Sequence, residues 1–456
     1  MSLVNIRRRD ERASPPTEIG PDAPRVYLET FGCQMNEADS ALIAGRLAEG
    51  GYHRVGDPAD ADVILINTCA VREKAEERVY GRTSQLLKHR RDNPDLVIGI
   101  TGCMAEHLKD KVAERAPHVG IVVGPDGYRD IASLVDEART GTRVVETKLR
   151  RDEVYEGLTS EREDDGVSAY VTIQRGCDKF CTFCVVPYTR GRERGVPPRE
   201  VLRQVRGLAE AGYREVVLLG QTVNSYRYEG ADFADLLRAV HEVDGIARIR
   251  FTSPYPVDFS PRVIEAMGTL PKICPQVHLP LQSGSDNVLA QMQRGYTRGE
   301  FVDLVHRLRR DVPTIALSTD ILVGFCGETE DDHAQTLEVV DELKFDSAFM
   351  FAYSDRGITH AARKMDDDVP AEVKQRRLHE VIERQEIHTR AAHDRRVGTR
   401  AEVLVGGTAR RGDRLIGRTA HFQNVLLPLS AGAAGDLVTA EITRSTGHSL
   451  HAVPVV

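Results

Sequence analysis

The first part of the chain alternates short apolar runs with longer amphipathic stretches. This pattern predicts strands over residues 25–31, 62–67, 96–101 and 119–123, and helices over residues 37–50, 71–91, from 105, and 128–139. Strands that alternate with helices in this way favour an open parallel sheet with helices on its faces. We therefore expect an α/β amino-terminal domain over residues 25–142.

A second α/β pattern follows a charged, weakly periodic stretch over residues 143–165, which we interpret as a linker. Six further strands are predicted, over residues 169–174, 216–219, 249–252, 277–279, 317–323 and 348–352, and a long helix over 371–396. Six strands in strand–helix order predict a partial (β/α)6 barrel over residues 166–396. In such barrels the active site lies at the carboxyl ends of the strands.

The last part of the chain changes to short β-rich pieces separated by closely spaced glycines, which is typical of a small β-barrel. We expect this barrel over residues 397–456. Its basic residues (Arg400, Arg410, Arg411, Arg414, Arg418 and Arg444) outnumber its acidic ones (Glu402, Asp413, Asp436 and Glu441). Small basic β-barrels suit single-stranded or looped RNA. A purely structural cap is the alternative.

Composition sets limits on these three units. A length of 456 residues fits about three domains. With 41% hydrophobic and 29% charged residues, and no apolar run near ~20 residues, the chain reads as a soluble cytoplasmic protein without a membrane span. Residues 1–24 are charged and lack the apolar core of a secretion signal, so we expect a disordered tail. The net charge of −8 means that nucleic-acid contacts would come from local basic clusters.

Three of the eight cysteines, Cys177, Cys181 and Cys184, form a C-x3-C-x2-C loop directly after the first barrel strand. Cysteine thiolates are the usual ligands of iron–sulfur clusters, and three of them leave one iron of a four-iron cube open for a small molecule. A structural zinc site would need a fourth Cys or His, and none lies between residues 175 and 195. A disulfide would leave one thiol over and would need an oxidising compartment.

A second cysteine triplet, Cys33, Cys69 and Cys103, follows three successive predicted strands of the first domain. The carboxyl ends of parallel strands line one crevice, so these thiols can converge on a second cluster. The alternative is three separate core cysteines. Cys274 and Cys326 lie outside both triplets and are expected to be small core or turn residues.

The C-x3-C-x2-C loop resembles the cluster loop of the radical S-adenosylmethionine (SAM) enzymes, in which SAM occupies the open iron. Glycines and small polar residues recur after the later barrel strands and favour a SAM pocket made by Gly220, Gln221, Ser283, Gly324, Gly327 and Glu328. Ordinary turn residues are the alternative. Residues 189–194, just past the loop, are either contacts for a phosphate or the SAM carboxylate, or a solvated loop.

Several longer stretches resemble the methylthiotransferase family of radical SAM enzymes, and in particular its MiaB branch, over about residues 25–453. They are residues 32–36, 67–72, 184–193, 219–226 and 279–285. The chain departs from that branch at Thr222, Tyr255, Cys326 and residues 358–360, none of which is a cluster ligand. The resemblance implies an amino-terminal cluster domain, a radical SAM core and a carboxyl-terminal TRAM domain.

The resemblance also implies a reaction, the 2-methylthiolation of N6-isopentenyladenosine beside the anticodon of tRNA. The cofactors would be two [4Fe–4S] clusters and SAM, with Cys177, Cys181 and Cys184 holding the catalytic cluster and Cys33, Cys69 and Cys103 the auxiliary one. The C2–H bond of adenine is neither acidic nor electrophilic, so radical chemistry is needed. The expected partners are the anticodon stem-loop of tRNA and a reductant such as flavodoxin or ferredoxin, and the expected state is a monomer.

Other functions remain open at this stage. Related branches act on threonylcarbamoyl-adenosine in tRNA or on a ribosomal-protein aspartate. A non-enzymatic iron–sulfur RNA-binding regulator is a further alternative, which would not need a barrel with recurring glycine turns.

Overall fold

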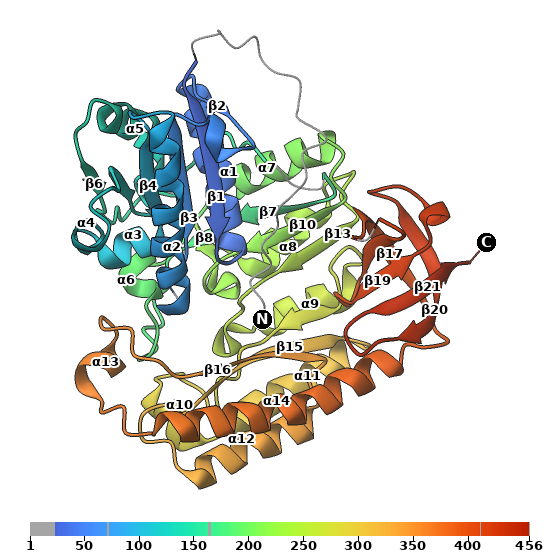
Figure 1. Ribbon diagram of the computed structural model, residues 1–456. Coiled ribbons are helices and arrows are strands. Elements are labelled where there is room, and N and C mark those ends of the chain that lie inside the picture. Colours follow the sequence, from blue (N-terminus) through green and yellow to red (C-terminus); the bar gives the residue numbers. More distant parts are fainter. Residues whose placement is uncertain (1–22, 71–72, 163–165, 411, 456) are drawn as a thin grey trace. The chain divides into compact units, whose positions relative to one another are not determined.

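The computed structural model describes residues 23–70, 73–162, 166–410 and 412–455 and divides into two compact units (Figure 1). The first unit holds the described part of Met1–Glu163 together with Arg175–Asp178 and Cys184–Arg194. The second holds the described part of Asp164–Gln174, together with Lys179–Phe183 and Gly195–Val456. The tail predicted over residues 1–24 lies, apart from its last two residues, outside the described residues.

A six-stranded parallel sheet forms the centre of the first unit, as the alternating pattern predicted. Its order is β2-β1-β3-β4-β5-β6. The strands are β1 (Arg25–Phe31), β2 (His53–Arg54), β3 (Val63–Thr68), β4 (Val97–Gly102), β5 (Ile121–Val123) and β6 (Val144–Glu146). The central strands β3 and β4 are buried along their whole length, which explains their continuous apolar runs.

Helices cover both faces of this sheet (Figure 1). On one face α1 (Gln34–Glu49) and α5 (Ile131–Arg139) pack Leu47 and Val135 against Leu65. On the other face α2 (Glu73–Leu86), α3 (Cys103–Leu108) and α4 (Lys111–Arg115) pack against Ile64 and Ile98. Three short 3₁₀ helices, η1 (Pro58–Asp60), η2 (Leu87–Arg91) and η3 (Tyr128–Asp130), connect these elements.

The stretch predicted to be a linker is packed in its first part. Residues 144–146 form the edge strand β6, paired with β5. Tyr155 is buried, its ring stacks on Tyr128 at a centroid distance of 5.9 Å, and the neighbouring Glu153 pairs with Arg129 at 2.7 Å. The stretch has no repeating apolar face. It is attached to the first unit by a few isolated residues, so its low periodicity did not reveal the packing.

The second unit contains the six predicted parallel strands, divided into two hydrogen-bonded sheets. One has the order β13-β10-β7 and the other β14-β15-β16, and a parallel bridge from Ile249 to Ile273 connects their neighbouring ends. The strands are β7 (Ser168–Thr172), β10 (Glu215–Leu219), β13 (Arg248–Phe251), β14 (Gln276–His278), β15 (Ala316–Val323) and β16 (Ser347–Ala352). The arrangement is the partial (β/α)6 barrel that the sequence predicted.

Helices follow most of these strands and cover the outside of the partial barrel. They are α7 (Pro198–Glu210), α8 (Phe233–His241), α9 (Pro261–Thr269), α10 (Asp286–Gln291), α11 (Arg298–Asp311), α12 (Glu330–Leu343), α13 (His360–Lys364) and α14 (Ala371–Asp394). Shorter elements are β8 (Gln174–Arg175), β9 (Arg194–Gly195), β11 (Arg227–Tyr228), β12 (Ala231–Asp232), η4 (Val223–Ser225) and η5 (Pro256–Asp258). The short helix α6 (Val186–Arg190) belongs to the first unit.

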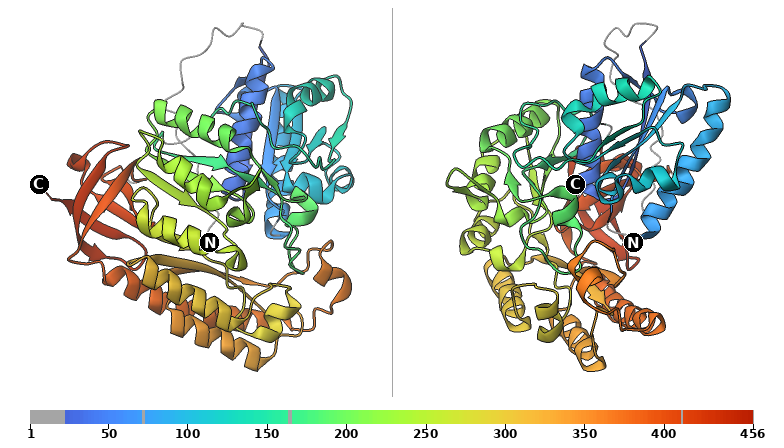
Figure 2. Two further views of the ribbon diagram at one scale, coloured as in Figure 1. Left: turned by 180° about the vertical axis from the view of Figure 1, so that it is seen from behind. Right: turned by 90° about the vertical axis from the view of Figure 1, so that its left-hand side faces the viewer.

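The carboxyl-terminal part of the second unit is a closed five-stranded barrel in the order β17-β18-β19-β21-β20 (Figure 2). Its strands are β17 (Arg400–Thr408), β18 (Leu415–Thr419), β19 (Asn424–Leu427), β20 (Leu437–Ser445) and β21 (Leu450–Pro454), with η6 (Leu429–Ala431) between β19 and β20. Four of these strands were predicted, and β21, which closes the barrel, was not. The core is apolar and includes Val403, Val425 and Ile442.

Candidate functional site

The triplet of the first domain, Cys33, Cys69 and Cys103, lies together because the strands that precede it end in register. Phe31 at the end of β1 pairs with Thr68 at the end of β3, and Thr68 pairs with Gly102 at the end of β4. Cys33, Cys69 and Cys103 follow these positions directly. The structure thus brings the three predicted residues to one edge of the sheet, where ligands bind in open parallel sheets.

Cys33 is held by the start of helix α1, for which it is the N-cap residue. The amide of Asn36 accepts a hydrogen bond from the Cys33 sulfur at 3.3 Å, and its own NH₂ donates to Asn67 of β3 at 3.2 Å. The Asn67 amide in turn donates to the Asn36 carbonyl at 2.8 Å and to the Ser40 hydroxyl at 2.9 Å. This buried network fixes the beginning of α1, and with it Cys33, to the end of β3.

Two glycines allow the backbone to come close at this edge. Gly32 has φ +143°, and a Cβ there would lie 2.9 Å from the Cβ of Cys69. Gly102 has φ +93°, and a Cβ there would lie 2.6 Å from the Thr68 carbonyl oxygen. Both positions therefore need glycine, for its backbone conformation and for space.

The thiols of this triplet influence one another. A hydrogen bond with Cys69 lowers the pKa of Cys33 to about 6 against the effect of burial, and the charge of Arg190 acts in the same direction. Burial raises the pKa of Cys103, while Arg190 opposes the rise. All eight cysteines are free thiols. A thiol whose pKa is lowered in this way is readily available as a metal ligand.

A buried cluster of charges lies directly behind Cys103. The guanidinium of Arg190, at the end of α6, donates from Nε to the Cys103 sulfur at 3.1 Å. Its Nη1 pairs with Asp39 of α1 at 2.7 Å, and the other Asp39 oxygen pairs with Arg175 at 2.7 Å. The three charged side chains are all at most 4% exposed.

The triplet of the C-x3-C-x2-C loop, Cys177, Cys181 and Cys184, lies after β8 in a loop whose segments belong to both units. In the first unit, Cys177 donates its backbone N–H to the Gly191 carbonyl at 3.1 Å, and Asp178 accepts from Arg192 at 2.6 Å. Gly176 has φ +76°, and a Cβ there would collide with the Arg192 carbonyl oxygen at 2.0 Å. Cys184 accepts a hydrogen bond from the Val186 N–H at 3.5 Å, just before α6.

In the second unit, Cys181 has its own buried arginine. Arg294 donates from Nη1 to the Cys181 sulfur at 3.3 Å, and its guanidinium lies 4.8 Å from the centre of the Tyr255 ring and 5.3 Å from that of Tyr296. Thr182 fixes the loop by donating to the carbonyls of Met292 and Gln291, at 3.1 and 2.9 Å. The same guanidinium donates to the Tyr296 hydroxyl at 3.0 Å and to the Pro280 carbonyl at 3.3 Å.

The chemistry of both triplets suits iron–sulfur clusters. Within the described residues, no group of three His, Cys, Asp or Glu side chains is arranged to hold a single metal ion. Thiolates alone select soft metals and iron–sulfur clusters over calcium or magnesium. The Nη2 atom of Arg190 is buried without a hydrogen-bond partner in the described structure, which fits an anionic group that would lie beside Cys103.

The residues predicted for a SAM pocket lie at the ends of three different strands. Gly220 follows β10, and a Cβ there would lie 2.6 Å from the Gln174 side-chain oxygen. Gln221 is half-buried beside it. Ser283, after β14, is buried, and its hydroxyl lies 3.3 Å from that of Thr336. Their contact with SAM stays a prediction.

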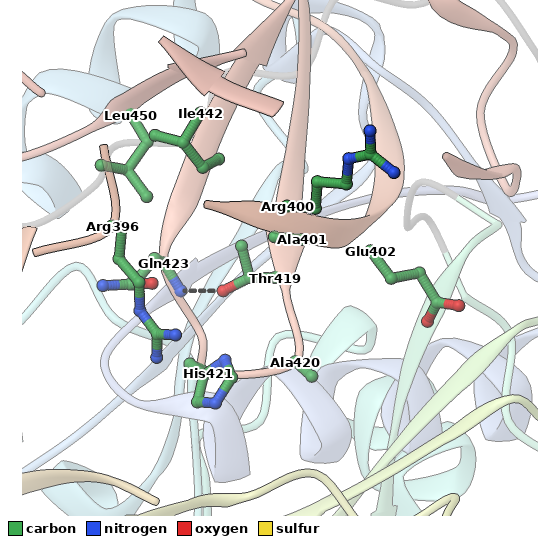
Figure 3. A pocket seen from close by; sticks show the side chains of 10 residues that line it. All are labelled: Arg396, Arg400, Ala401, Glu402, Thr419, Ala420, His421, Gln423, Ile442 and Leu450. Atoms are coloured by element: carbon green, nitrogen blue, oxygen red, sulfur yellow. Dashed lines mark hydrogen bonds between the residues drawn. The ribbon is translucent and has the colours of Figure 1, made fainter. Parts of the chain in front are cut away.

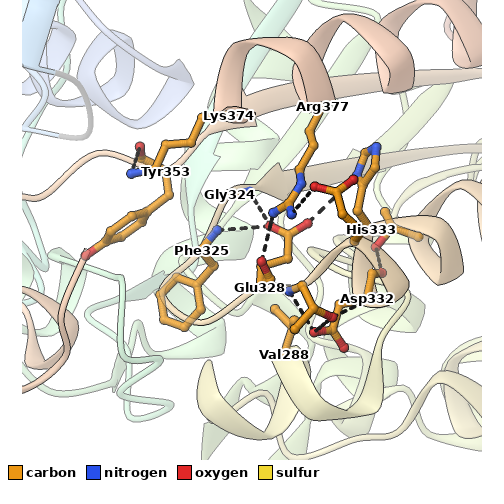
Figure 4. A network of polar contacts seen from close by, with 12 residues as sticks. Val288, Gly324, Phe325, Glu328, Asp332, His333, Tyr353, Lys374 and Arg377 are labelled. Atoms are coloured by element: carbon orange, nitrogen blue, oxygen red, sulfur yellow. Dashed lines mark hydrogen bonds and ion pairs between the residues drawn. The ribbon is translucent and has the colours of Figure 1, made fainter. Parts of the chain in front are cut away.

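Glu328 belongs to a network of polar contacts after β15 (Figure 4). Its carboxylate accepts from the backbone N–H groups of Gly324 and Phe325, the latter at 3.1 Å, and lies 3.7 Å from Arg377 of α14. Burial raises the pKa of Glu328 to about 7. The neighbouring Gly327 donates its N–H to Asp368 at 2.7 Å. Glu328 and Gly327 thus hold the turn that the sequence assigned to the pocket.

Comparison with known proteins decides the family. The chain is 44% identical to the tRNA-2-methylthio-N(6)-dimethylallyladenosine synthase of Chlorobium luteolum, over 94% of this chain and 97% of that protein. The synthases of Porphyromonas gingivalis and Christiangramia forsetii are 42% and 38% identical, over 93% and 94% of this chain and 94% of each relative. This chain belongs to that synthase family.

Three domain families match this synthase family member in the order that the fold shows. They are the uncharacterized protein family UPF0004 over residues 25–124, the radical SAM superfamily over residues 171–340 and the TRAM domain over residues 394–455. The radical SAM methyltransferase TsrM from Kitasatospora setae has a similar fold, with a TM-score of 0.53 and 14% identity over 72% of this chain and 75% of that one. The cobalamin-dependent enzyme OxsB gives 0.50, with 14% identity over 81% and 58%.

Sequence reasoning missed several residues of the synthase site. Arg190 and Arg194 were left as either ligand contacts or a solvated loop, whereas both are buried, and Arg194 pairs with Asp126 at 2.9 Å. Asp39 and Arg294 were not singled out at all. Their partners lie far away along the chain, so no local spacing could have indicated them. Cys274 and Cys326 are buried, as predicted.

The carboxyl-terminal barrel carries a small cavity of about 180 Å³ where it joins the end of α14 (Figure 3). Arg396, Arg400, Glu402, His421 and Gln423 line it together with apolar residues. Burial lowers the pKa of His421 to about 4, so this ring is neutral at physiological pH. The cavity therefore presents arginines, a neutral histidine and the Glu402 carboxylate, which pairs with Arg248 at 3.1 Å.

The barrel is attached firmly to β13. Arg250 pairs with the buried Glu215 at 2.7 Å and donates to the carbonyls of Thr419 and Ala420 at 2.8 and 2.9 Å. Arg248 donates to the carbonyls of Arg418 and Glu402 at 2.7 and 2.9 Å. Of the basic barrel residues singled out, Arg400, Arg410, Arg418 and Arg444 are exposed, Arg414 is half-buried, and Arg411 lies outside the described residues.

None of the helices that the structure describes is long and apolar enough to cross a membrane.

Proposed function

We propose that this protein is a tRNA methylthiotransferase that converts N6-isopentenyladenosine beside the anticodon to its 2-methylthio derivative with SAM. The observation that carries the proposal is the convergence of Cys33, Cys69 and Cys103 at one sheet edge, in a chain that also has the radical SAM loop. One triplet would suffice for SAM cleavage. A second one supports a reaction that also needs a source of sulfur.

The ligands follow from the two triplets. Cys177, Cys181 and Cys184 would hold the [4Fe–4S] cluster that radical SAM enzymes use, and Cys33, Cys69 and Cys103 would hold a second one. When bound, the two clusters would supply the electron for SAM cleavage and the sulfur for transfer. We assign the SAM pocket to Gly220, Gln221, Ser283, Gly324, Gly327 and Glu328, as their positions at the strand ends favour.

The chain's own residues prepare these sites. Arg294 donates to Cys181 and Arg190 to Cys103, so each triplet has one sulfur oriented by a buried guanidinium. Gly176 and Gly102 let the backbone turn sharply beside the ligands. The amide network of Asn36 and Asn67 keeps Cys33 at the sheet edge.

The proposed substrate rests on the terminal barrel and on the activity for which the relatives are named. The exposed arginines of the barrel would contact tRNA phosphates, and the isopentenyl group would add apolar surface whose burial is worth ~0.8 kcal/mol per CH₂. The target adenine must leave its stack, which costs a few kcal/mol and is easiest in a single-stranded loop. A reductant such as flavodoxin or ferredoxin, a cytoplasmic location and a monomeric state complete the proposal.

Mass spectrometry of tRNA nucleosides tests this function. Anaerobically reconstituted protein, SAM, dithionite and tRNA bearing isopentenyladenosine should produce 2-methylthio-isopentenyladenosine, and tRNA with unmodified adenosine should react poorly. A Cys274→Ala variant serves as the matched control, because this buried thiol lies outside both triplets. Preferential methylthiolation of threonylcarbamoyl-adenosine or of a ribosomal-protein peptide would refute the substrate and leave the cluster assignments intact.

A further inference from the structure

Arg190 combines three features that a merely structural arginine does not need. It is 3% exposed, it donates to the sulfur of a proposed cluster ligand, and one of its nitrogens, Nη2, is buried without a partner in the described structure. A buried donor without a partner lowers the stability of the folded chain. Such a cost is expected where the partner is a group that binds from outside the chain.

The charge balance around Arg190 points in the same direction. Arg175 and Arg190 share one carboxylate, that of Asp39, which is fully buried. Arg175 is further supported by the Tyr155 ring, 4.5 Å from its guanidinium carbon. Two buried cations with one anion leave an excess positive charge next to Cys103. Buried charge is tolerated when a counter-charge lies close, and a thiolate-ligated cluster would supply it.

We propose that Arg190 is a positioning residue of the auxiliary cluster, which orients the Cys103 sulfur and raises the reduction potential of that cluster. The inference rests on the proposed function, because it requires the second cluster. Reduction adds one electron and thus one negative charge. Hydrogen bonds to ligand sulfurs and nearby positive charge stabilise the reduced form more than the oxidised one. Asp39 limits how much Arg190 raises the reduction potential, since it fixes the guanidinium and offsets part of its charge.

The neighbouring Arg194 provides a matched control. It is also buried, it lies four residues further along the chain at the start of β9, and it pairs with Asp126 at 2.9 Å. Its further hydrogen bonds go to the carbonyls of Arg190 and Arg150, and none goes to a cysteine in the described structure. Removing Arg194 therefore takes away a buried ion pair without touching a cluster ligand.

The experiment uses full-length protein with Cys177, Cys181 and Cys184 replaced by Ala, so that only the auxiliary cluster is present. Iron content, melting temperature and the reduction midpoint are measured for this parent and for Arg190→Gln, Arg190→Lys, Asp39→Asn and Arg194→Gln. The midpoint comes from an anaerobic dithionite titration followed by electron paramagnetic resonance. Dithionite donates the single electron that each cluster accepts.

We expect Arg190→Gln to make the cluster at least tenfold harder to reduce, a midpoint about 59 mV more negative for one electron. Arg190→Lys, which keeps the charge, should lie between the parent and Arg190→Gln. Asp39→Asn should shift the midpoint in the opposite direction, because it removes the compensating charge. Arg194→Gln should leave the midpoint unchanged even if the protein becomes less stable.

An Arg190→Gln protein with full iron content and the parent's midpoint would overturn the inference, and so would an equal shift in Arg194→Gln. If Arg190→Gln fails to hold iron, Asp39→Asn decides, because an unchanged or more negative midpoint there contradicts the proposal. A parent that binds no iron would instead refute the second cluster of the proposed function. Failure of the inference and failure of the function are thus distinguishable.

Discussion

Single cysteines in this protein differ by their surroundings more than by their burial. Burial raises the pKa of Cys274 to about 11, so that thiol stays protonated, whereas the contact with Cys69 lowers the pKa of Cys33 to about 6. Only a thiolate binds metal well. Cys33 has an acidic thiol, and Cys103 and Cys181 have an arginine donor, and all three belong to the two triplets. The pKa values of Cys274 and Cys326 are raised by burial instead.

Iron content tests whether the two triplets, and not Cys274 and Cys326, hold the clusters. Reconstituted wild-type protein should hold about eight irons, from two four-iron cubes. Replacing Cys33, Cys69 and Cys103 together by Ala should leave about half of the iron and preserve SAM cleavage while abolishing sulfur transfer. Replacing Cys177, Cys181 and Cys184 should also leave half but abolish SAM cleavage. The Cys274→Ala and Cys326→Ala controls should keep all the iron, and an equal loss of both activities from either triplet would contradict the assignment.

Glu328 gives a prediction about pH. Burial raises its pKa from 4.5 to about 7, so the folded protein binds this proton more tightly than the unfolded chain does. The cost of ionising the buried carboxylate appears as the pH rises from about 4.5 to 7 and is complete above that range, where it amounts to about 3 kcal/mol. Wild-type protein should therefore gain stability relative to Glu328→Gln when the pH falls from 8 to 5.

Denaturant unfolding of both proteins at pH 5 and pH 8 measures this difference. Glu330→Gln is the matched control, because hydrogen bonds with Arg376 and Arg377 lower the pKa of Glu330 to about 2. Glu330 is therefore ionised in both the folded and the unfolded chain between pH 5 and 8, and its substitution should give a difference that does not change with pH. If the stability difference between wild type and Glu328→Gln were also independent of pH, the pKa of the Glu328 carboxyl group would not be raised.

Among the elements, the start of α3 is the most constrained. Cys103 is the first residue of this short helix, and Gly102, its N-cap, has a backbone conformation that only glycine adopts readily. The surrounding atoms come from the end of β3, so the position of Cys103 depends on how α3 meets that strand. A displacement at this junction would therefore move Cys103, which we propose as a cluster ligand.

Substituting Gly102 by Ala tests this dependence. The change should cost about 1–3 kcal/mol in backbone strain and add a collision with the Thr68 carbonyl oxygen, which displaces α3. We expect about half of the iron to be lost, with the radical SAM cluster retained. Gly212→Ala is the control, since Gly212 has a similar φ of +91° but no atom within 4 Å of an added Cβ. Equal iron loss in the two variants would refute a specific role for the junction.

At the scale of the whole molecule, the terminal barrel cannot be removed without consequence. Arg248 and Arg250 of β13 donate to carbonyls of the barrel, and a deletion would remove these acceptors from two buried guanidinium groups, of which Arg250 would keep its ion pair with Glu215. If deletion of the barrel weakened RNA binding, the loss of RNA contacts could not be told apart from damage to the core around β13. Point substitutions of exposed arginines are the better test.

The combined variant Arg400→Gln, Arg418→Gln and Arg444→Gln should bind tRNA more weakly at low salt. Each phosphate contact contributes to counterion release, so the slope of log K against log salt should fall by up to about three. Filter binding at several salt concentrations measures this slope. Arg310→Gln on α11 is the control for an exposed arginine outside the barrel. Identical slopes for wild type and the triple variant would exclude the barrel as the RNA-binding surface.

The sequence by itself determined the elements that repeat and the residues that are spaced regularly. All six strands of the partial barrel and strands β1, β3, β4 and β5 of the first sheet were predicted within a few residues, because apolar periodicity records local burial. The two cysteine triplets were predicted too. One lies within a single loop, and the other follows equivalent strand ends, so topology alone brings its members together.

Only the tertiary structure decided how these residues are supported. The edge strands β2 and β6 and the closing strand β21 are short and are specified by their neighbours more than by their own pattern. The partners of Arg190, Arg294 and Tyr155 come from distant parts of the chain. A contact between positions so far apart leaves no trace in local spacing, since it depends on how whole elements pack. The two groups of cysteines could therefore be singled out from the sequence, where their role as cluster ligands stays a prediction, and the arginines that contact them could not.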